Sequence, residues 1–216
     1  MGKVAVILSG CGYLDGSEIH ESVLCLLHLS KKGHEYMCYA PDKEQKKVMN
    51  HLNKKEVKTE KRNCLSEASR IARGNIAPLE SLKEKEFDAL LMPGGMGAVL
   101  NFSDFTEKGV HCTIDKVLKE IILSFFKAKK PIGATCIAPV LIAKALEGIA
   151  SVQMTLGTDK EYQSILNQMG MKGKLASVKE CICDTEHLIY TTPCYMEPDD
   201  LAGMSEGVEA LVNNFI

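Results

Sequence analysis

The chain has 216 residues and a formal net charge of −2 at pH 7, from 26 basic and 28 acidic side chains. This length suits one α/β domain with a sizeable core, so residues 1–216 are expected to form a single domain. The basic residues are not concentrated in a patch, which argues against a nucleic-acid partner. No apolar run approaches the ~20 residues that a membrane span requires.

The first residues, Met1-Gly2-Lys3, lead directly into the apolar run VAVILS, without the features of a signal or transit peptide. The sequence therefore predicts a cytoplasmic protein. A mitochondrial protein whose transit peptide had been removed would look the same.

Nine cysteines are scattered through the chain, and in a reducing compartment they are expected to be free thiols. Cys181 and Cys183 are two residues apart, which on a strand places both side chains on one face. No further ligands stand at the spacing of a metal site, so neither a metal nor another cofactor is expected.

Apolar runs alternate with helical periodicity along the whole chain. In chain order, the pattern predicts strand 3–10, helix 17–32, strand 34–42, helix 43–55, a short helical piece around 66–74, strand 87–95, helix 107–129, strand 130–136, helix 137–148, strand 150–156, helix 159–170, strands 177–183 and 187–192, and helix 199–215. This alternation predicts a doubly wound α/β fold, in which helices cover both faces of a mainly parallel sheet. In the first helix, the side chains predicted to face the sheet are Ile19, Val23, Leu26, Leu27 and Ser30.

Three segments with unusual residues directly follow predicted strands: SGCGYLDGSE (9–18), MPGGMGA (92–98) and GATCIAP (133–139). In open α/β sheets, ligands bind outside the carboxyl ends of the strands. The three segments are therefore the candidates for a common functional site.

Cys136 stands between a predicted strand and a predicted helix, with the small residues Gly133, Ala134 and Ala138 around it. Small neighbours permit a sharp, strained turn that lifts the central side chain above the sheet. The positive end of the following helix dipole favours a thiolate and is expected to lower the pKa of Cys136. We therefore interpret Cys136 as a nucleophile, although cysteine is more often a buried small hydrophobic residue.

The segment Pro93-Gly94-Gly95 places two glycines at the end of another predicted strand. Glycines there allow backbone N–H groups to turn toward a ligand, so the N–H groups of Gly95 and Ile137 are a candidate oxyanion hole. A simple tight turn would need the same residues.

Glu18 has two interpretations. Asp15 and Glu18 have the spacing of a capping box, which indicates an ordinary role at the start of a helix. Alternatively, Glu18 faces Cys136 across the strand ends, where a protonated carboxyl would donate a hydrogen bond to sulfur or shuttle a proton.

A dinucleotide site is the less favoured interpretation of the same loop. Gly10, Gly12 and Gly16 form G-x-G-x-x-x-G, which differs from the G-x-G-x-x-G fingerprint. Asp15 and Glu18 at the helix start would also repel a pyrophosphate.

Nearly the whole chain resembles the DJ-1/PfpI superfamily, the class I glutamine amidotransferase-like fold, and within it the ElbB group and the animal ES1-type proteins. The resemblance is carried, in this order, by GCGYLDGSEIHES, CYAPDK, ESLKEKEFDALLMPGGMGA, KPIGATCIAPVLIAKAL and TTP. The segments CIAP and DGSEIHE are specific to the group, whereas PGG is not.

The resemblance implies a flavodoxin-like three-layer sandwich and a homodimer, with Cys136 as the elbow cysteine and Glu18 as its acidic partner. It also implies a weak, cofactor-free glyoxalase activity that converts a small 2-oxoaldehyde, glyoxal or methylglyoxal, into the hydroxy acid. The alternative is a non-catalytic redox-sensing or binding protein that uses the same cysteine.

The chain departs from the wider superfamily at the residue after the elbow cysteine, which is Ile137. Proteases and amidotransferases of the superfamily place a histidine there or elsewhere within reach. His187 lies in DTEHLIY, which looks like a turn leading into a strand. Without a base beside the nucleophile, neither glutamine amidotransferase nor protease activity is expected.

Overall fold

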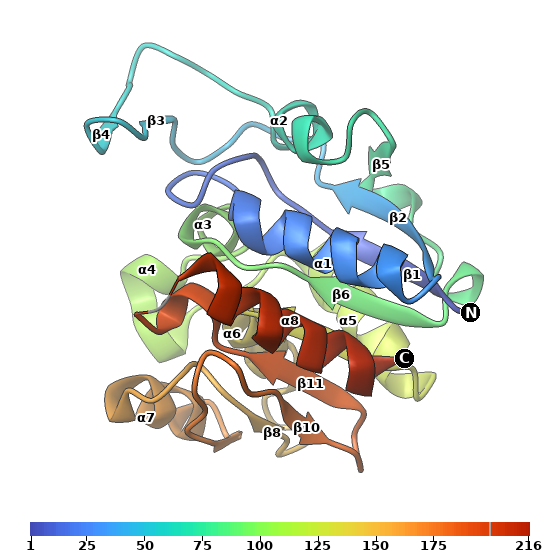
Figure 1. Ribbon diagram of the computed structural model, residues 1–216. Helices are drawn as coiled ribbons and strands as arrows, with labels where there is room; N and C mark the ends of the chain where they lie inside the picture. The colour runs from blue at the N-terminus through green and yellow to red at the C-terminus, as the bar shows by residue number, and fades with distance from the viewer. Residues whose placement is uncertain (199) are drawn as a thin grey trace.

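The computed structural model describes residues 1–198 and 200–216 (Figure 1). Seven strands form one sheet in the order β10-β11-β7-β6-β1-β2-β5. Their bounds are β1 Lys3–Ile7, β2 Glu35–Ala40, β5 Ile76–Pro78, β6 Ala89–Met92, β7 Ile132–Thr135, β10 Ile182–Asp184 and β11 Ile189–Thr192. Neighbouring strands are parallel, apart from β10, which runs antiparallel to β11. The mainly parallel sheet that the sequence predicts is confirmed.

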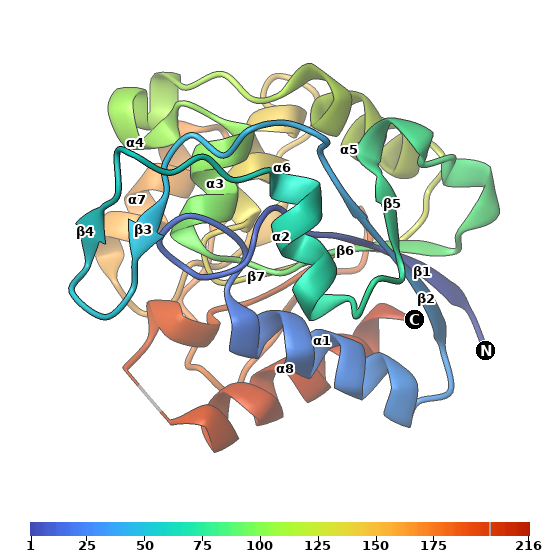
Figure 2. The same ribbon diagram turned by 90° about the horizontal axis from the view of Figure 1, so that it is seen from above.

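Helices cover both faces of this sheet. They are α1 Ile19–Lys31, α2 Cys64–Ile71, α3 Met96–Phe102, α4 Phe105–Lys108, α5 Lys116–Lys127, α6 Pro139–Leu146, α7 Lys160–Gln168 and α8 Leu201–Phe215. Figure 2 shows α1 beside α8 on one face of the sheet and α5 beside α6 on the other. The molecule is therefore the three-layer, flavodoxin-like sandwich that was expected. None of the described helices combines the length and hydropathy that a membrane crossing requires.

The central strands are mostly apolar because both faces of the sheet are covered. Every residue of β6, β7 and β11 is buried, and β1 is buried after its first residue. These strands join the inner faces of the helices in one continuous hydrophobic core. The core fixes the carboxyl ends of β1, β6 and β7 next to one another.

The predicted helix at 43–55 is wrong. Residues in this segment form a small antiparallel hairpin, with β3 Met49–Asn50 paired to β4 Lys55–Glu56. Asn50 Oδ1 accepts a hydrogen bond from the backbone N–H of Leu52, and Asn53 Oδ1 accepts one from Lys55. Asparagine side chains that bond nearby N–H groups in this way stabilise turns at the expense of helix.

The predicted helix at 107–129 is too long at its beginning. Asp115 caps α5 by accepting hydrogen bonds from the N–H groups of Val117 and Leu118, so the helix begins at Lys116. Short helical turns precede it, including α3 and α4, which the sequence did not indicate. The strands predicted at 150–156 and 177–183 are reduced to β8 Gln153–Met154 and to the start of β10, and β8 pairs with β9 Lys172–Gly173.

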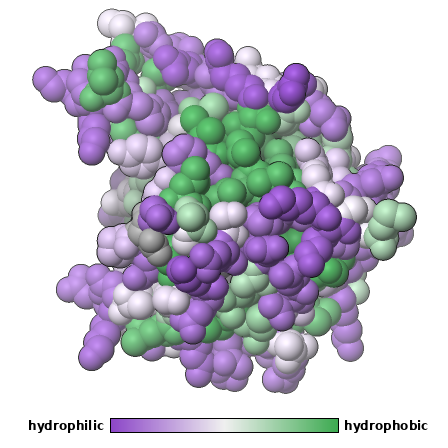
Figure 3. Space-filling view, in the orientation of Figure 1, coloured by the Kyte–Doolittle hydropathy of each residue, from purple (hydrophilic) through white to green (hydrophobic). Residues whose placement is uncertain are grey.

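Helix α1 buries a different face from the predicted one. Ile19, Val23 and Leu27 are 43%, 48% and 42% exposed, and Ser30 is exposed as well. The buried residues are Glu21, Ser22, Leu24, Cys25, Leu26, His28 and Leu29. Figure 3 shows apolar side chains gathered on the surface over this helix. The polar residues are tolerated inside because they find hydrogen-bond partners there.

Candidate active site

The three segments singled out in the sequence meet at the carboxyl ends of β1, β6 and β7. The N–H of Glu18 donates to the carbonyl of Gly94 at 2.9 Å, which joins the first segment to the second. A Cβ on Gly94 would lie 2.5 Å from Cβ of Cys136, which shows how closely the second segment approaches the third. Strand order reverses beside β1, which places this site at the topological switch point of the sheet.

Cys136 lies on the strained turn that the sequence predicts. Strand β7 ends at Thr135, helix α6 begins at Pro139, and Cys136 between them has φ 57°. A non-glycine residue in this left-handed region costs about 1–3 kcal/mol and persists only when its surroundings impose it. The N–H of Cys136 donates to the carbonyl of Thr192 at 3.0 Å, which ties the turn to the adjacent strand.

The surroundings of the Cys136 sulfur combine a carboxyl group with backbone donors. The backbone N–H groups of Gly95 and Ile137 and the carboxyl of Glu21 lie close enough to the Cys136 side chain to influence its pKa. The residue is only 7% exposed. Burial and the Glu21 carboxyl raise the pKa of the thiol well above its ordinary value, while the two N–H groups act in the opposite direction.

The expectation that the helix N-terminus lowers the pKa of Cys136 is therefore wrong. Desolvation disfavours the charged thiolate more strongly than the backbone donors favour it. A thiolate at this position needs a neighbour that can take up the thiol proton.

Glu21 is the acid that contacts Cys136, and the sequence did not single it out. Its Oε2 accepts hydrogen bonds from the N–H of Gly94 at 3.0 Å and from the hydroxyl of Thr135 at 2.8 Å. Glu21 is fully buried, and burial raises the pKa of its carboxyl to about 7. A carboxyl with this pKa holds or releases a proton near neutral pH, which suits an exchange of protons with the thiol.

Glu18 lies at the start of α1, but not as part of a capping box with Asp15, which bonds the N–H of Met49 instead. It is the N-cap of α1, where its Oε2 accepts a hydrogen bond from the N–H of Glu21 at 2.8 Å. It also lines the cavity in front of Cys136. The spacing Glu18-x-x-Glu21, one helical turn, is the sequence signal from which the second acid could have been found.

A cavity of about 670 Å³ opens over the sulfur. Its lining residues are Tyr13, Leu14, Glu18, His20, Gly95, Met96, Cys136, Ile137, Tyr195 and Met196. The four residues proposed from the sequence, Cys136, Glu18, Gly95 and Ile137, are thus brought together in one cavity. Most of the remaining lining is apolar or aromatic, with few polar groups, as in small-molecule sites.

The cavity wall contains a histidine that the sequence interpretation overlooked. His20 Nδ1 lies 2.6 Å from the hydroxyl of Tyr195, and both side chains line the cavity. His20 comes from the first turn of α1, within DGSEIHES, and Tyr195 from the short helical turn Cys194–Met196.

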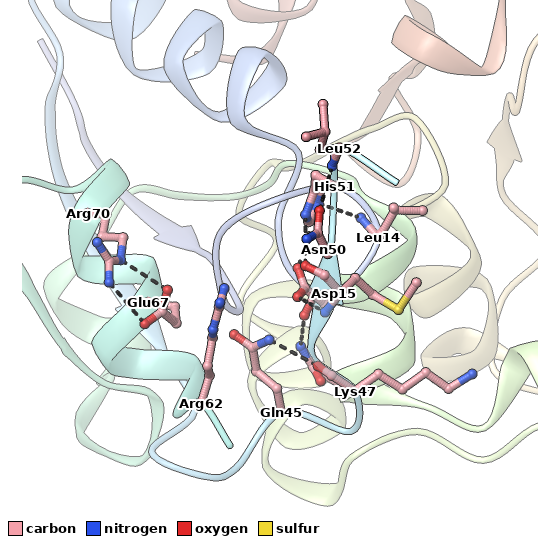
Figure 4. Close-up of polar contacts among 12 residues, drawn as sticks. Leu14, Asp15, Gln45, Lys47, Asn50, His51, Leu52, Arg62, Glu67 and Arg70 are labelled. Carbon is pink, nitrogen blue, oxygen red and sulfur yellow. Dashed lines mark hydrogen bonds and ion pairs between the residues drawn. The ribbon is translucent and has the colours of Figure 1, made fainter. Parts of the chain in front are cut away.

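The β3–β4 hairpin holds the opposite wall in place. Asp15 Oδ2 accepts a hydrogen bond from the N–H of Met49 at 2.6 Å, and Leu14 donates its N–H to His51 Nε2 at 3.3 Å. Figure 4 shows His51 next to Asp15 and joined by a dashed line to Leu14. The distance from His51 Nε2 to Asp15 Oδ1 is 3.7 Å. The segment that was predicted to be a separate helix therefore positions the loop that contains Tyr13 and Leu14.

Among the residues that the structure describes, no group of three or more His, Cys, Asp or Glu side chains could hold a metal ion. The chemistry that this arrangement can perform rests on the thiol, the two carboxyls and the backbone donors.

Similar proteins identify the family. No protein-family model matches the chain. "ES1 protein homolog, mitochondrial" from Rattus norvegicus is 38% identical over an alignment of 223 residues, which covers 99% of this chain and 83% of the rat protein. "Glutamine amidotransferase-like class 1 domain-containing protein 3, mitochondrial" from Homo sapiens is also 38% identical, over 99% of this chain and 82% of the human protein.

Solved structures agree with this relationship. An isoprenoid biosynthesis protein with an amidotransferase-like domain from Ehrlichia chaffeensis superposes with a TM-score of 0.92 at 36% identity, covering 99% of this chain and 98% of its own. Drosophila melanogaster DJ-1beta, at 15% identity, has a TM-score of 0.54 over 100% of this chain and 92% of its own, which shows a shared fold alone. The chain belongs to the ES1 family of glutamine amidotransferase-like proteins, within the DJ-1/PfpI fold.

Proposed function

We propose that the chain is a cofactor-free glyoxalase that converts a small 2-oxoaldehyde, such as glyoxal or methylglyoxal, into the corresponding hydroxy acid. The observation that carries the proposal is the Cys136 sulfur itself. The Glu21 carboxyl and the backbone N–H groups of Gly95 and Ile137 lie beside it. Cys136 and Glu18 line the same cavity.

The first step forms a hemithioacetal. The Cys136 proton passes to the Glu21 carboxylate, and the thiolate attacks the aldehyde carbon. As the C–S bond forms, the carbonyl π pair moves to oxygen, and the N–H groups of Gly95 and Ile137, which lie near the sulfur, stabilise it. The proton held by Glu21 then neutralises this oxygen.

The second step moves hydrogen between the two carbons. Glu18 removes the proton from the carbon bound to sulfur, which produces an enediolate with its negative charge on the neighbouring oxygen. The hydroxyl proton on the sulfur-bound carbon passes to that oxygen, and Glu18 returns its own proton to the neighbouring carbon. The product is a thioester of the hydroxy acid. Water cleaves the thioester, and the cysteine thiol is restored.

The cavity favours a short substrate with a mostly apolar body. Leu14, Met96 and Ile137 line it, and the paired His20 and Tyr195 side chains supply a polar edge. The His20–Tyr195 pair is placed to hydrogen-bond the second carbonyl of a 2-oxoaldehyde or its hydrate.

Single substitutions test the roles of Cys136 and Glu18. Cys136→Ser is expected to abolish turnover of glyoxal and methylglyoxal. Glu18→Gln preserves an oxygen that can cap α1 but cannot shuttle a proton, so kcat is expected to fall roughly 10²-fold or more. Glu35→Gln, at an exposed position on β2, serves as the matched control and should retain the wild-type rate.

Hydroxy acid formation should be followed by chromatography, with far-ultraviolet circular dichroism to verify that each variant is folded. Wild-type protein that produces no hydroxy acid would refute the glyoxalase proposal. A Glu18→Gln variant as fast as wild type would refute the role of Glu18. The role of Cys136 is tested separately by Cys136→Ser.

Glutamine amidotransferase chemistry is less well supported. In such enzymes a histidine must take the proton from the cysteine. Here the group beside the Cys136 thiol is the carboxyl of Glu21, and His20 is hydrogen-bonded to the hydroxyl of Tyr195 instead. Incubation with glutamine is expected to release no ammonia above the rate of Cys136→Ser.

Redox sensing by Cys136 is the second alternative. Rapid oxidation requires an accessible thiolate, but Cys136 is 7% exposed and burial raises its pKa. These observations favour catalysis over sensing at this residue. Sulfenic acid trapping on Cys136 at low peroxide, without glyoxalase turnover, would favour the sensor.

The compartment is part of the proposal. The rat, human and zebrafish relatives have names that include the word mitochondrial. We propose that the protein works in the mitochondrion or the cytoplasm, and the relatives' names favour the mitochondrion. Cell fractionation followed by immunoblotting would decide between the two.

A further inference from the structure

A pair of cysteines lies away from the cavity, at the start of the outermost strand of the sheet: Cys183 is on β10, and Cys181 directly precedes this strand. The sulfur atoms of Cys181 and Cys183 are 3.8 Å apart. Both side chains are partly exposed, and Cys183 lies opposite Tyr190 on β11. The sequence expectation that the two side chains share a face is confirmed.

This proximity distinguishes the pair from the other seven cysteines. Cys11 is partly exposed, and the remaining six, Cys25, Cys38, Cys64, Cys112, Cys136 and Cys194, are buried. A pair of accessible thiols in contact can react as a unit, because the second thiol attacks a bond that the first has formed.

A disulfide between these residues requires a local contraction of the backbone, because it brings the two Cβ atoms to about 3.5–4.5 Å and residues two apart on an extended strand are farther apart than this. A strand rises about 3.3 Å per residue, so the Cα atoms of residues two apart are roughly 6.6 Å from each other. This spacing lies near the upper end of the 4.4–6.8 Å range that a disulfide spans, so the sulfurs must approach by roughly 1.8 Å. Since β10 is at the edge of the sheet, its free side can adjust to this movement.

A bond formed at the limit of its range is easily reduced again. Strained or exposed disulfides have higher reduction potentials than structural ones and are the labile kind. The pair is therefore suited to reversible oxidation rather than to stabilising the fold.

We propose that Cys181 and Cys183 form a redox-active dithiol that is oxidised to an intrachain disulfide by small-molecule disulfides such as oxidised glutathione. The thiolate of one cysteine attacks a sulfur of the small disulfide, which forms a mixed disulfide and expels one thiolate. The second cysteine loses its proton and attacks the protein-bound sulfur, which closes the intrachain bond and expels the second thiolate. Two electrons and two protons pass from the protein to the small disulfide, which becomes two thiols.

The experiment uses the folded full chain in the Cys136→Ser background, so that the active-site cysteine takes no part. The protein is incubated with oxidised glutathione, its remaining thiols are blocked with N-ethylmaleimide, and it is digested with an enzyme that cleaves after glutamate. Mass spectrometry of the fragment Cys181–Glu186 is expected to show a loss of two hydrogen atoms and no N-ethylmaleimide. Dithiothreitol added before blocking should restore two alkylation sites.

The variants Cys181→Ser and Cys183→Ser provide the matched controls. Each removes the resolving thiol, so the remaining cysteine is expected to retain glutathione as a mixed disulfide. A short cysteine-containing peptide in the same tube verifies that the oxidant is active. Three results would overturn the proposal. In the first, both cysteines are alkylated although the peptide is oxidised. In the second, the wild-type pair retains glutathione, and in the third, either cysteine forms a disulfide with Cys194.

Discussion

Glu21 shows how a single buried side chain organises the active site. It accepts hydrogen bonds from Gly94 and Thr135, which belong to two different strand ends, and it contacts Cys136. Two adjacent negative charges are unfavourable at this depth, so the carboxylate and the thiolate are not expected to be present together. In the proposed mechanism, the raised pKa suits Glu21 to take up the thiol proton.

The raised pKa of Glu21 predicts a specific dependence of stability on pH. A carboxyl whose pKa rises from 4.5 to about 7 on folding binds more protons in the folded chain than in the unfolded chain between these values. Its contribution to stability is complete below the unfolded pKa and is lost as the pH rises through about 7. Glu21→Gln removes this contribution because the amide does not titrate.

Between about pH 5 and pH 8, the unfolding free energy of Glu21→Gln relative to wild type is therefore expected to increase by about 2–3 kcal/mol. Urea unfolding at both pH values measures this difference, with the exposed Glu35→Gln as the control that should show none. Wild-type and Glu21→Gln stabilities that change in parallel with pH would contradict the assignment.

At the scale of secondary-structure elements, α3 and the loop between β1 and α1 form one unit. The N–H of Gly97 donates to the carbonyl of Tyr13 at 2.8 Å, and the N–H of Ala98 donates to that of Gly16 at 3.0 Å. A Cβ on Gly97 would lie 1.8 Å from the backbone nitrogen of Gly16. This close approach of two backbones determines where Tyr13 enters the cavity wall.

Gly97→Ala tests this contact. The added methyl group must push the loop away from α3, so we expect a loss of stability of about 3 kcal/mol and a slower glyoxalase reaction. Gly148→Ala is the control, because it has φ 74° and open space around it. The control should lose only about 1–2 kcal/mol from backbone strain and keep its activity.

Thermal unfolding and turnover of both variants distinguish the clash of the added methyl group with the loop from backbone strain alone. If Gly97→Ala were as stable and as active as Gly148→Ala, the packing of α3 against the loop would not position the cavity wall.

On the scale of the whole molecule, the exposed stripe of α1 is the feature that the fold leaves unburied. Ile19, Val23 and Leu27 follow one another at intervals of four residues, and each is at least 42% exposed. Because the resemblance to the DJ-1/PfpI superfamily implies a homodimer, we expect this stripe to be covered by a second copy of the chain.

Val23→Glu is expected to convert the dimer to a monomer, because a charge would be buried without a partner. Leu52→Glu places the same change at a residue that is 96% exposed in the β3–β4 turn, and it should leave the dimer intact. Light scattering at micromolar concentration measures both masses. A wild-type monomer would contradict the dimer, and a dimeric Val23→Glu variant would contradict the choice of surface.

Local pattern determined most of the architecture. Largely apolar runs predict β1, β6 and β7, because strands covered on both faces need mostly apolar side chains. The elbow at Cys136 was also predictable, because small residues around a cysteine between a strand and a helix are themselves the requirement of that turn. The hairpin at 43–55 was missed because its turns depend on side-chain hydrogen bonds that periodicity does not register.

Tertiary structure alone decided which groups surround the sulfur. Glu18 and Glu21 lie one helical turn apart in sequence, and only the docking of α1 against β6 and β7 places Glu21 on Cys136. The pairing of His20 with Tyr195 likewise joins residues 175 positions apart. The pKa of Cys136 follows the same rule: the sequence places the thiol at a helix start, but burial, a property of the folded chain, determines the direction of the shift.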